Sequence, residues 1–390
     1  MAQLRILYLV TTLMDLSVAA ATFAVGRRAA ELGATAFELG LLGSVWLGVY
    51  SVCAPLAGRL SDRAGRRMMA IVGTAIAAVS TLACAFTTNI PFLLVLTGVM
   101  GMGVGMYWPP IIVWVGGGLT GRPLAARMAR FSVAWNVGML IGYGISGKVF
   151  QFDPRLSFVL AAGGMGVIVL LLSLQRGEAT TTAPTETAMV ELRHVPKGRG
   201  FRKTAWLSNF SMLFAVAGML ALFPQLATRT GIAPDLHGYL LLLHRLAALG
   251  VVLVLPHFQF WQTRLWPLWI VQAIAVLGVA AIGVGESTAW FCAALMVCGA
   301  MLGYNYQASI LFTFEEMTEK GKGSGIHEAM LGLGAFFGPI LAGWVGNHFN
   351  SSMRTPYFFC AAVLAAFIVI EMGLVVWRRG QLGGSSGTPS

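Results

Sequence analysis

Two ionisable side chains lie inside apolar stretches that are long enough to cross a membrane. Asp15 is near the middle of the run 5–25, and Arg245 is near the middle of the run 236–256. A charge at the bilayer centre is costly, so such residues usually pair with each other, bind a proton or contact a polar ligand. The positions of Asp15 and Arg245 therefore predict either an ion pair between the two residues or an Asp15 carboxyl group that takes up a proton. The alternative for both residues is a structural role, which for Asp15 is a hydrogen bond within its helix bundle.

Aromatic and amide side chains gather in two other apolar runs. Trp108 follows Tyr107 in one run, and Tyr304 and Gln307 share a helical face in the other. Asn136 adds an amide in a third run. These groups suit an organic solute with rings or hydroxyl groups, because they offer stacking and hydrogen bonds. Ordinary packing between helices is the alternative interpretation.

The composition excludes an ordinary water-soluble protein. Hydrophobic side chains make up 57% of the 390 residues and charged ones only 11%, whereas a soluble domain carries about 25% charged residues. The net charge of +11 does not indicate a nucleic-acid partner, because the basic residues lie in short loops between apolar runs. Their placement is typical of a protein that is oriented in a lipid bilayer.

Twelve runs approach the roughly 20 apolar residues that a spanning helix needs. A polar linker at 176–203 separates six runs from the other six, so we expect an N-terminal bundle over 1–175 and a C-terminal bundle over 204–379, followed by a tail at 380–390. The predicted spans are 5–25, 38–58, 68–88, 91–113, 128–150, 155–175, 205–226, 236–256, 266–284, 288–311, 325–347 and 355–377. The bias of Lys and Arg toward one side of the membrane predicts that both termini are cytoplasmic.

A repeat of glycines supports two related halves. A shift of 196 residues superposes one glycine pattern on another: Gly138, Gly142 and Gly147 on Gly334, Gly338 and Gly343. The same shift places Asp15 on Ser211 and Trp108 on Tyr304. Paired halves with small residues at helix contacts are common in transporters. Chance recurrence is the alternative, because the chain contains 48 glycines.

The loop between the second and third runs carries the most specific motif, GRLSDRAGRR at 58–67. Asp62 can bond nearby backbone amides, and Gly65 can adopt a positive φ in a tight turn. The motif resembles the loop signature of the major facilitator superfamily, G-x-L-x-D-R-x-G-R-K/R. The matching residues are Gly58, Leu60, Asp62, Arg63, Gly65, Arg66 and Arg67.

This resemblance implies an all-α membrane protein with twelve transmembrane helices in two pseudo-symmetric six-helix bundles. It implies a secondary transporter that works by alternating access, with the first, fourth, seventh and tenth helices lining the central path. The substrate-binding residues would be Asp15, Trp108, Asn136, Arg245, Tyr304 and Gln307. Separately from the resemblance, the charge layout predicts that the basic 58–67 loop meets an acidic patch of the second half, Glu315, Glu316 and Glu328, and forms a cytoplasmic gate of the outward-open state. Ordinary loop charges are the alternative, because exposed ion pairs contribute only ~0–1 kcal/mol each.

Departures from the family pattern leave proton coupling open. Many proton-coupled relatives carry an arginine in the fourth helix, where this chain has Thr97. An uncoupled facilitator and a non-transporting membrane sensor on the same fold are therefore alternatives. An enzyme is not expected, since His327-Glu328 is followed by Leu331 rather than the second histidine of a zinc motif. We expect no cofactor or metal, a lipid bilayer, a small organic solute with or without protons as partners, no nucleic acid, and a monomer.

Overall fold

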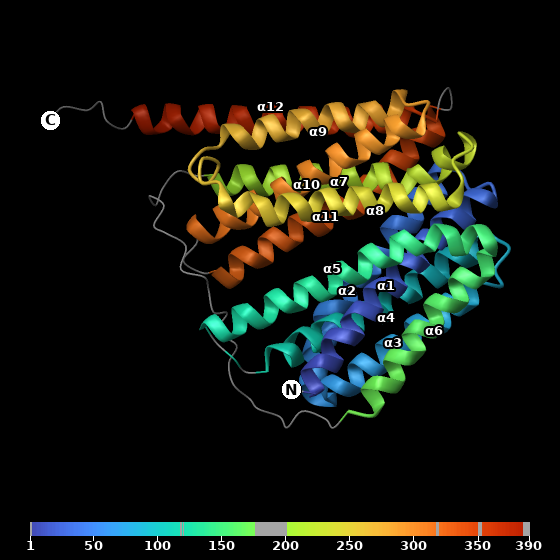
Figure 1. Ribbon diagram of the computed structural model, residues 1–390. Helices are drawn as coiled ribbons and strands as arrows, with labels where there is room; N and C mark the ends of the chain where they lie inside the picture. Colours follow the sequence, from blue (N-terminus) through green and yellow to red (C-terminus); the bar gives the residue numbers. More distant parts are fainter. Residues whose placement is uncertain are drawn as a thin grey trace. The chain divides into compact units, whose positions relative to one another are not determined.

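Twelve α-helices account for almost all of the described chain in the computed structural model (Figure 1). The structure describes residues 2–117, 119, 121–175, 201–316, 320–349 and 353–384. The helices are α1 (Ala2–Glu31), α2 (Ala36–Ala64), α3 (Arg66–Cys84), α4 (Ile90–Gly116), α5 (Gly121–Phe152), α6 (Pro154–Ser173), α7 (Phe201–Arg229), α8 (Pro234–Val254), α9 (Trp266–Val284), α10 (Thr288–Glu316), α11 (Lys320–His348) and α12 (Thr355–Gly384), with a 3₁₀ turn, η1 (Leu255–His257), after α8.

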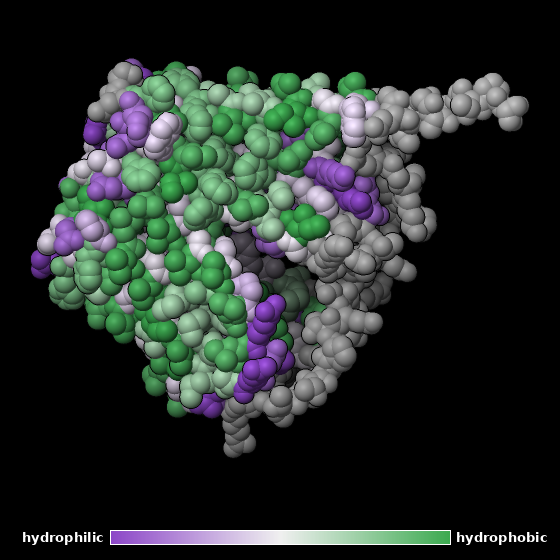
Figure 2. Space-filling view, turned by 180° about the vertical axis from the view of Figure 1, so that it is seen from behind, coloured by the Kyte–Doolittle hydropathy of each residue, from purple (hydrophilic) through white to green (hydrophobic). Residues whose placement is uncertain are grey.

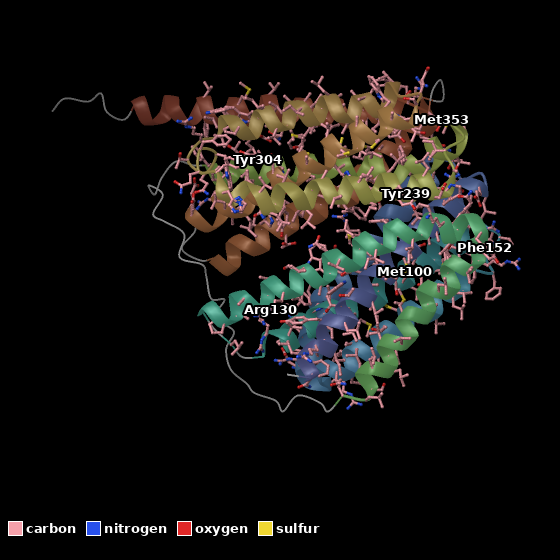
Figure 3. The ribbon with its side chains drawn as sticks, viewed as in Figure 1. Met100, Arg130, Phe152, Tyr239, Tyr304 and Met353 are labelled. Atoms are coloured by element: carbon pink, nitrogen blue, oxygen red, sulfur yellow. The ribbon has the colours of Figure 1, made fainter. Side chains whose placement is uncertain are left out.

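Eleven of these helices are long and apolar enough to cross a membrane. The predicted span 128–150 also forms a helix, α5, but its charged, amide and glycine residues keep it below that standard of composition. Arg130 lies toward the start of α5 and Phe152 at its end (Figure 3). Apolar side chains cover most of the face drawn in Figure 2. Val79 and Leu277 are among the large apolar residues that are exposed on the protein, and a lipid environment suits such residues.

Local signals explain where several helices begin and end. Thr35 and Glu38 form a reciprocal capping box at the start of α2, and the Asn89 side chain accepts a hydrogen bond from the Phe92 amide at the start of α4. Gly65 separates α2 from α3 with a φ of +91°, a conformation that costs glycine least. The predicted positive φ at Gly65 is therefore present, and the expected loop is a single-residue turn.

The contacts divide the chain into two compact units. Unit 1 comprises Met1–Glu191 and Ala221–Leu242, and unit 2 comprises Leu192–Leu220 and Leu243–Ser390. The end of α7 and the start of α8 thus belong with the first six helices. Most of the predicted linker, 176–200, and the end of the tail, 385–390, lie outside the described residues. The domain boundaries expected from the sequence remain a prediction.

The same glycine contacts occur in both halves of the chain. At each of eight glycines a Cβ atom would lie within 3.0 Å of a carbonyl oxygen on a neighbouring helix, so the helices approach as closely as only glycine permits. In the first half the pairs are Gly138 over Thr12, Gly142 over Leu16, Gly101 over Trp46 and Gly105 over Tyr50; in the second half they are Gly334 over Phe210, Gly338 over Phe214, Gly299 over His244 and Gly303 over Ala248.

These contacts correct the register of the repeat. The shift of 196 holds from α5 to α11, but α1, α2 and α4 map onto α7, α8 and α10 with a shift of 198. The two-residue difference arises between the glycine contacts, because Gly138 follows Gly105 by 33 positions whereas Gly334 follows Gly303 by 31. Asp15 therefore corresponds to Leu213 rather than Ser211. In the same way, Trp108 corresponds to Tyr306 rather than Tyr304.

Candidate functional site

Asp15 lies inside unit 1 and does not face lipid. Its side chain is on α1 and the residue is only 5% exposed. The hydroxyl group of Tyr107, a fully buried residue of α4, has Asp15 and Thr11 among its electrostatic neighbours. The carboxyl group is thus positioned between α1 and α4, next to aromatic and hydroxyl groups. This environment can hold a proton or hydrogen-bond a polar group, as the sequence analysis predicts.

Three aromatic rings form a cluster on α4 and α5 of unit 1. The Trp108 ring meets Tyr107 edge to face at 5.1 Å between centroids and meets Phe131 in the same way at 6.0 Å. Trp108 is half-buried, whereas Tyr107 belongs to the core. We call these three residues the Trp108 cluster. It offers a rigid aromatic edge that a ring-containing solute can contact.

Asn136, the predicted amide of α5, is occupied within its own helix. Its Nδ2 atom donates a hydrogen bond to the carbonyl oxygen of Ser132 at 2.9 Å. The Asn136 Oδ1 atom can still accept a hydrogen bond from another polar group. Asn136 is half-buried, so its role in binding a solute remains a prediction.

In unit 2, the predicted binding residues on α10 lie beside the turn that follows α8. Tyr304 is 6% exposed and packs against the Trp261 ring at 5.8 Å (Figure 3). The Trp261 indole donates to the carbonyl oxygen of Leu255 at 3.1 Å, which fixes the ring. Gln307 lies one turn further along α10 and is half-buried. The aromatic pair therefore gives unit 2 its own rigid polar and aromatic surface.

Arg245 is a half-buried residue of α8. Its neighbour His244 is fully buried, and the His244 Nδ1 atom forms a hydrogen bond with the Leu295 carbonyl oxygen at 3.0 Å. The histidine thus connects α8 to α10, while Arg245 is the more accessible of the two. Asp15 belongs to unit 1 and Arg245 to unit 2, so the ion pair between them stays a prediction.

The 58–67 motif forms the turn between α2 and α3. Asp62 and Arg63 are exposed at the end of α2. Arg67 donates from Nη2 to the carbonyl oxygen of Ser173, which connects the start of α3 to the end of α6. A Cβ at Gly58 would make only an ordinary contact with Pro109 at 3.6 Å. Within the motif, Arg67 is thus held by a hydrogen bond in unit 1, whereas the Asp62 carboxylate is accessible to other groups.

Glu316 of the predicted gate has a structural task within unit 2. Its carboxylate accepts hydrogen bonds from the backbone amides of Phe201 at 2.6 Å and Arg202 at 3.3 Å. A carboxylate at the first turn of α7 also interacts favourably with the helix dipole. Glu315 is half-buried and Glu328 is exposed. Whether this patch meets the 58–67 motif in the transport cycle stays a prediction.

A contact that the sequence did not reveal joins the α7–α8 hairpin, residues 221–242, to the other helices of unit 1. The Arg27 Nη2 atom donates to the carbonyl oxygen of Ile232 at 3.0 Å, and Gln225 donates to that of Ala34 at 2.9 Å. Arg27 lies beyond the predicted span 5–25, but α1 continues to Glu31 and Arg27 is 6% exposed. The arginine therefore acts as a buried attachment for the hairpin.

The hairpin is also held by aromatic and glycine contacts. His237 is 1% exposed and lies against the Phe23 ring at 4.8 Å and the Phe223 ring at 5.2 Å. A Cβ at Gly147 of α5 would lie 2.6 Å from the Asp235 Cα. The hairpin can thus take this position only because α5 has a glycine there.

Comparison with known proteins agrees with this architecture. The family model of the Major Facilitator Superfamily matches residues 7–318. This chain belongs to the Major Facilitator Superfamily. Two relatives are the Quinolone resistance protein NorA of Staphylococcus aureus, 26% identical over 144 residues, and Multidrug resistance protein 1 of Bacillus subtilis, 21% identical over 342 residues. The NorA match spans 37% of each chain, and the second match spans 84% of each.

Solved structures of the superfamily share the fold. The nucleoside transporter NupG superposes with a TM-score of 0.76 at 13% identity, covering 96% of this chain and 98% of NupG. A bacterial homologue of the human lysosomal transporter Spinster, in an inward-facing and occupied conformation, gives a TM-score of 0.74 at 14% identity with 96% of both chains covered. The chain is therefore a multi-pass membrane protein of a transporter family, with the predicted all-α fold. These family members are transporters rather than enzymes.

Proposed function

We propose that this chain is a secondary transporter that moves small organic solutes with aromatic rings across the cell membrane by alternating access. The observation that carries the proposal is the Trp108 cluster, in which half-buried Trp108 packs on the buried rings of Tyr107 and Phe131, with the Asp15 carboxyl group next to Tyr107. Rings bind rings through stacking and edge contacts, and the carboxyl group adds a polar anchor or a proton site. The names of the two bacterial relatives, which refer to quinolones and to multiple drugs, point to the same class of solute.

The remaining binding and gating residues extend this proposal. Tyr304 and Gln307 of α10 and Arg245 of α8 supply aromatic, amide and cationic groups from unit 2. The motif at 58–67 and the acids Glu315 and Glu316 of α10 and Glu328 of α11 act as the cytoplasmic gate. We further propose that the protein is a monomer. We place both termini in the cytoplasm, because the Lys and Arg residues concentrate in the segments on the same side of the membrane as the termini.

The test is quinolone counterflow into proteoliposomes that contain the purified full chain. A fluorescent quinolone should exchange faster than in protein-free vesicles. Trp108→Ala should raise the quinolone concentration that gives half-maximal exchange about 2- to 13-fold, the equivalent of ~0.5–1.5 kcal/mol for an aromatic pair. Trp108→Phe should recover most of the lost affinity. The matched control is Trp377→Ala, since Trp377 is 60% exposed at the end of α12.

Three outcomes separate the alternatives. Quinolone binding without counterflow would favour a membrane sensor. Counterflow that ignores a pH gradient, in wild type and in Asp15→Asn alike, would favour an uncoupled facilitator. Equal effects of Trp108→Ala and Trp377→Ala would contradict the role of the Trp108 cluster.

A further inference from the structure

Unit 2 contains a buried carboxyl group that the proposed solute site does not use. Glu371 lies in the membrane-spanning part of α12 and is fully buried. α12 packs beside α9 (Figure 1), and the Gln272 Nε2 atom of α9 donates to the Glu371 Oε1 atom at 3.0 Å. Gln272 is fully buried as well. A fixed amide thus faces an acid in the low-dielectric interior.

A chain of hydrogen bonds leads from Glu371 to two further helices. The Gln272 Nε2 atom also lies 3.4 Å from the Ser211 Oγ atom of α7, and Ser211 donates to the carbonyl oxygen of Ser208 at 3.1 Å. The Ser208 hydroxyl in turn donates to the Asn305 Oδ1 atom of α10. All of these side chains are fully buried. One polar path therefore crosses unit 2 from α12 through α9 and α7 to α10.

Among the side chains that the structure describes, the helices around Glu371 offer it no compensating cation. α9 has no charged residue along its length, and the charged residues of α7, Arg202, Lys203 and Arg229, lie near its ends. On α11, His327 bonds to Ser309 of α10, Glu328 is exposed, and the His348 Nδ1 atom forms a hydrogen bond with the Trp344 carbonyl oxygen, while Lys320 and Lys322 are residues of the first turn. Among the described residues, the electrostatic neighbours of Glu371 are Gln272 and Trp269.

An ionised carboxylate at this place would be desolvated and without a cation, which is strongly unfavourable. The neutral acid needs only hydrogen bonds, and an amide suits both forms of the group. The Gln272 N–H group donates to a carboxylate. After a turn of the amide plane its carbonyl oxygen accepts from the acid O–H group instead. The same rotation places the Gln272 Oε1 atom next to Ser211. The Ser211 hydroxyl can then donate to this oxygen instead of to the Ser208 carbonyl oxygen.

We propose that Glu371 is a proton-binding site and that Gln272 and Ser211 transmit its protonation to α7 and α10. The ligand is a proton, which forms an O–H bond on a carboxylate oxygen and is released again when the site contacts water. The role in coupling rests on the proposed transport function. The binding of the proton itself does not.

Infrared difference spectroscopy of the purified full chain in lipid tests proton binding directly. Wild type at neutral pH should show C=O stretching absorption of buried carboxylic acids, to which Asp15 can also contribute, and one component of this absorption should be missing in Glu371→Gln. The control Glu286→Gln should leave it in place, because the Glu286 side chain is 82% exposed. Glu371→Asp retains a carboxyl group and should shift the band, which keeps the test valid if the amide variant folds poorly. Carboxylic-acid absorption that is identical in wild type and Glu371→Gln would overturn the proposal.

Coupling is tested by quinolone flux in proteoliposomes with a pH-sensitive dye inside. In wild type, quinolone movement should be accompanied by proton movement. In Glu371→Gln the number of protons moved for each quinolone should fall at least tenfold. An unchanged ratio would refute the coupling role. If wild type moves no quinolone, the proposed function fails, while the infrared band still decides whether Glu371 binds a proton.

Discussion

The hairpin formed by residues 221–242 should loosen when Gly147 gains a side chain. A Cβ at this position would lie 2.6 Å from the Asp235 Cα, and backbone atoms cannot move aside by changing a rotamer. Overpacking of this kind costs about 1–3 kcal/mol. An energy of ~1–3 kcal/mol corresponds to a change of about 5- to 150-fold in an equilibrium constant. Gly147→Ala should therefore raise the population of states in which the hairpin has left α5 by that factor.

Amide hydrogen exchange of the full chain in lipid nanodiscs measures this opening. Exchange of the 221–242 amides should accelerate in Gly147→Ala, because local opening sets the exchange rate of protected amides. The matched control is Gly163→Ala on α6, where no atom lies within 4 Å of the added Cβ. This control should leave the hairpin unchanged. Equal protection of the hairpin in both variants would refute the inferred role of Gly147.

Three further predictions concern gating and stability. Asp62→Asn should change the turnover of solute more than its binding, and an unchanged turnover would reject the gate. Glu316→Gln should lower the melting temperature by the equivalent of ~0.5–2 kcal/mol, because the α7 amides lose a charged cap; an unaltered melting curve would contradict this. Gly101→Ala and Gly299→Ala should destabilise the protein to a similar degree, since each glycine lies against a backbone carbonyl in the equivalent helix pair. Destabilisation of one variant alone would contradict the repeat.

Much of the fold follows from the sequence because lipid imposes a simple rule on segment length and polarity. All twelve apolar runs form helices, and Gly65 adopts the positive φ that its motif predicts. The register of the repeat was harder to predict, since the glycines of α5 and α11 alone cannot show a difference in their spacing from the glycines of α4 and α10. The glycine contacts between helices, such as those of Gly101 and Gly299 with the α2 and α8 carbonyls, revealed the shift of 198.

The candidate site was predicted less completely than the fold. Asp15 and Trp108 lie near Tyr107, as a polar and aromatic cluster requires. Glu371 was missed, although a single acid within the apolar run 355–377 is a signal of the same kind as Asp15. Arg27 lies just past the predicted span 5–25 and beside Arg28, a pattern that is typical of a membrane boundary. Its partner, the Ile232 carbonyl oxygen, lies far away in the sequence and could not be inferred from it.

The central claim is that this member of the Major Facilitator Superfamily carries an aromatic organic solute across the membrane. Quinolone counterflow into proteoliposomes without any ion gradient tests it most directly, because such exchange needs only a carrier that alternates between two sides. We predict a transient accumulation of labelled quinolone above the level of protein-free vesicles, and a weaker apparent affinity in Trp108→Ala. Folded wild-type protein that binds quinolone but produces no accumulation would contradict the claim.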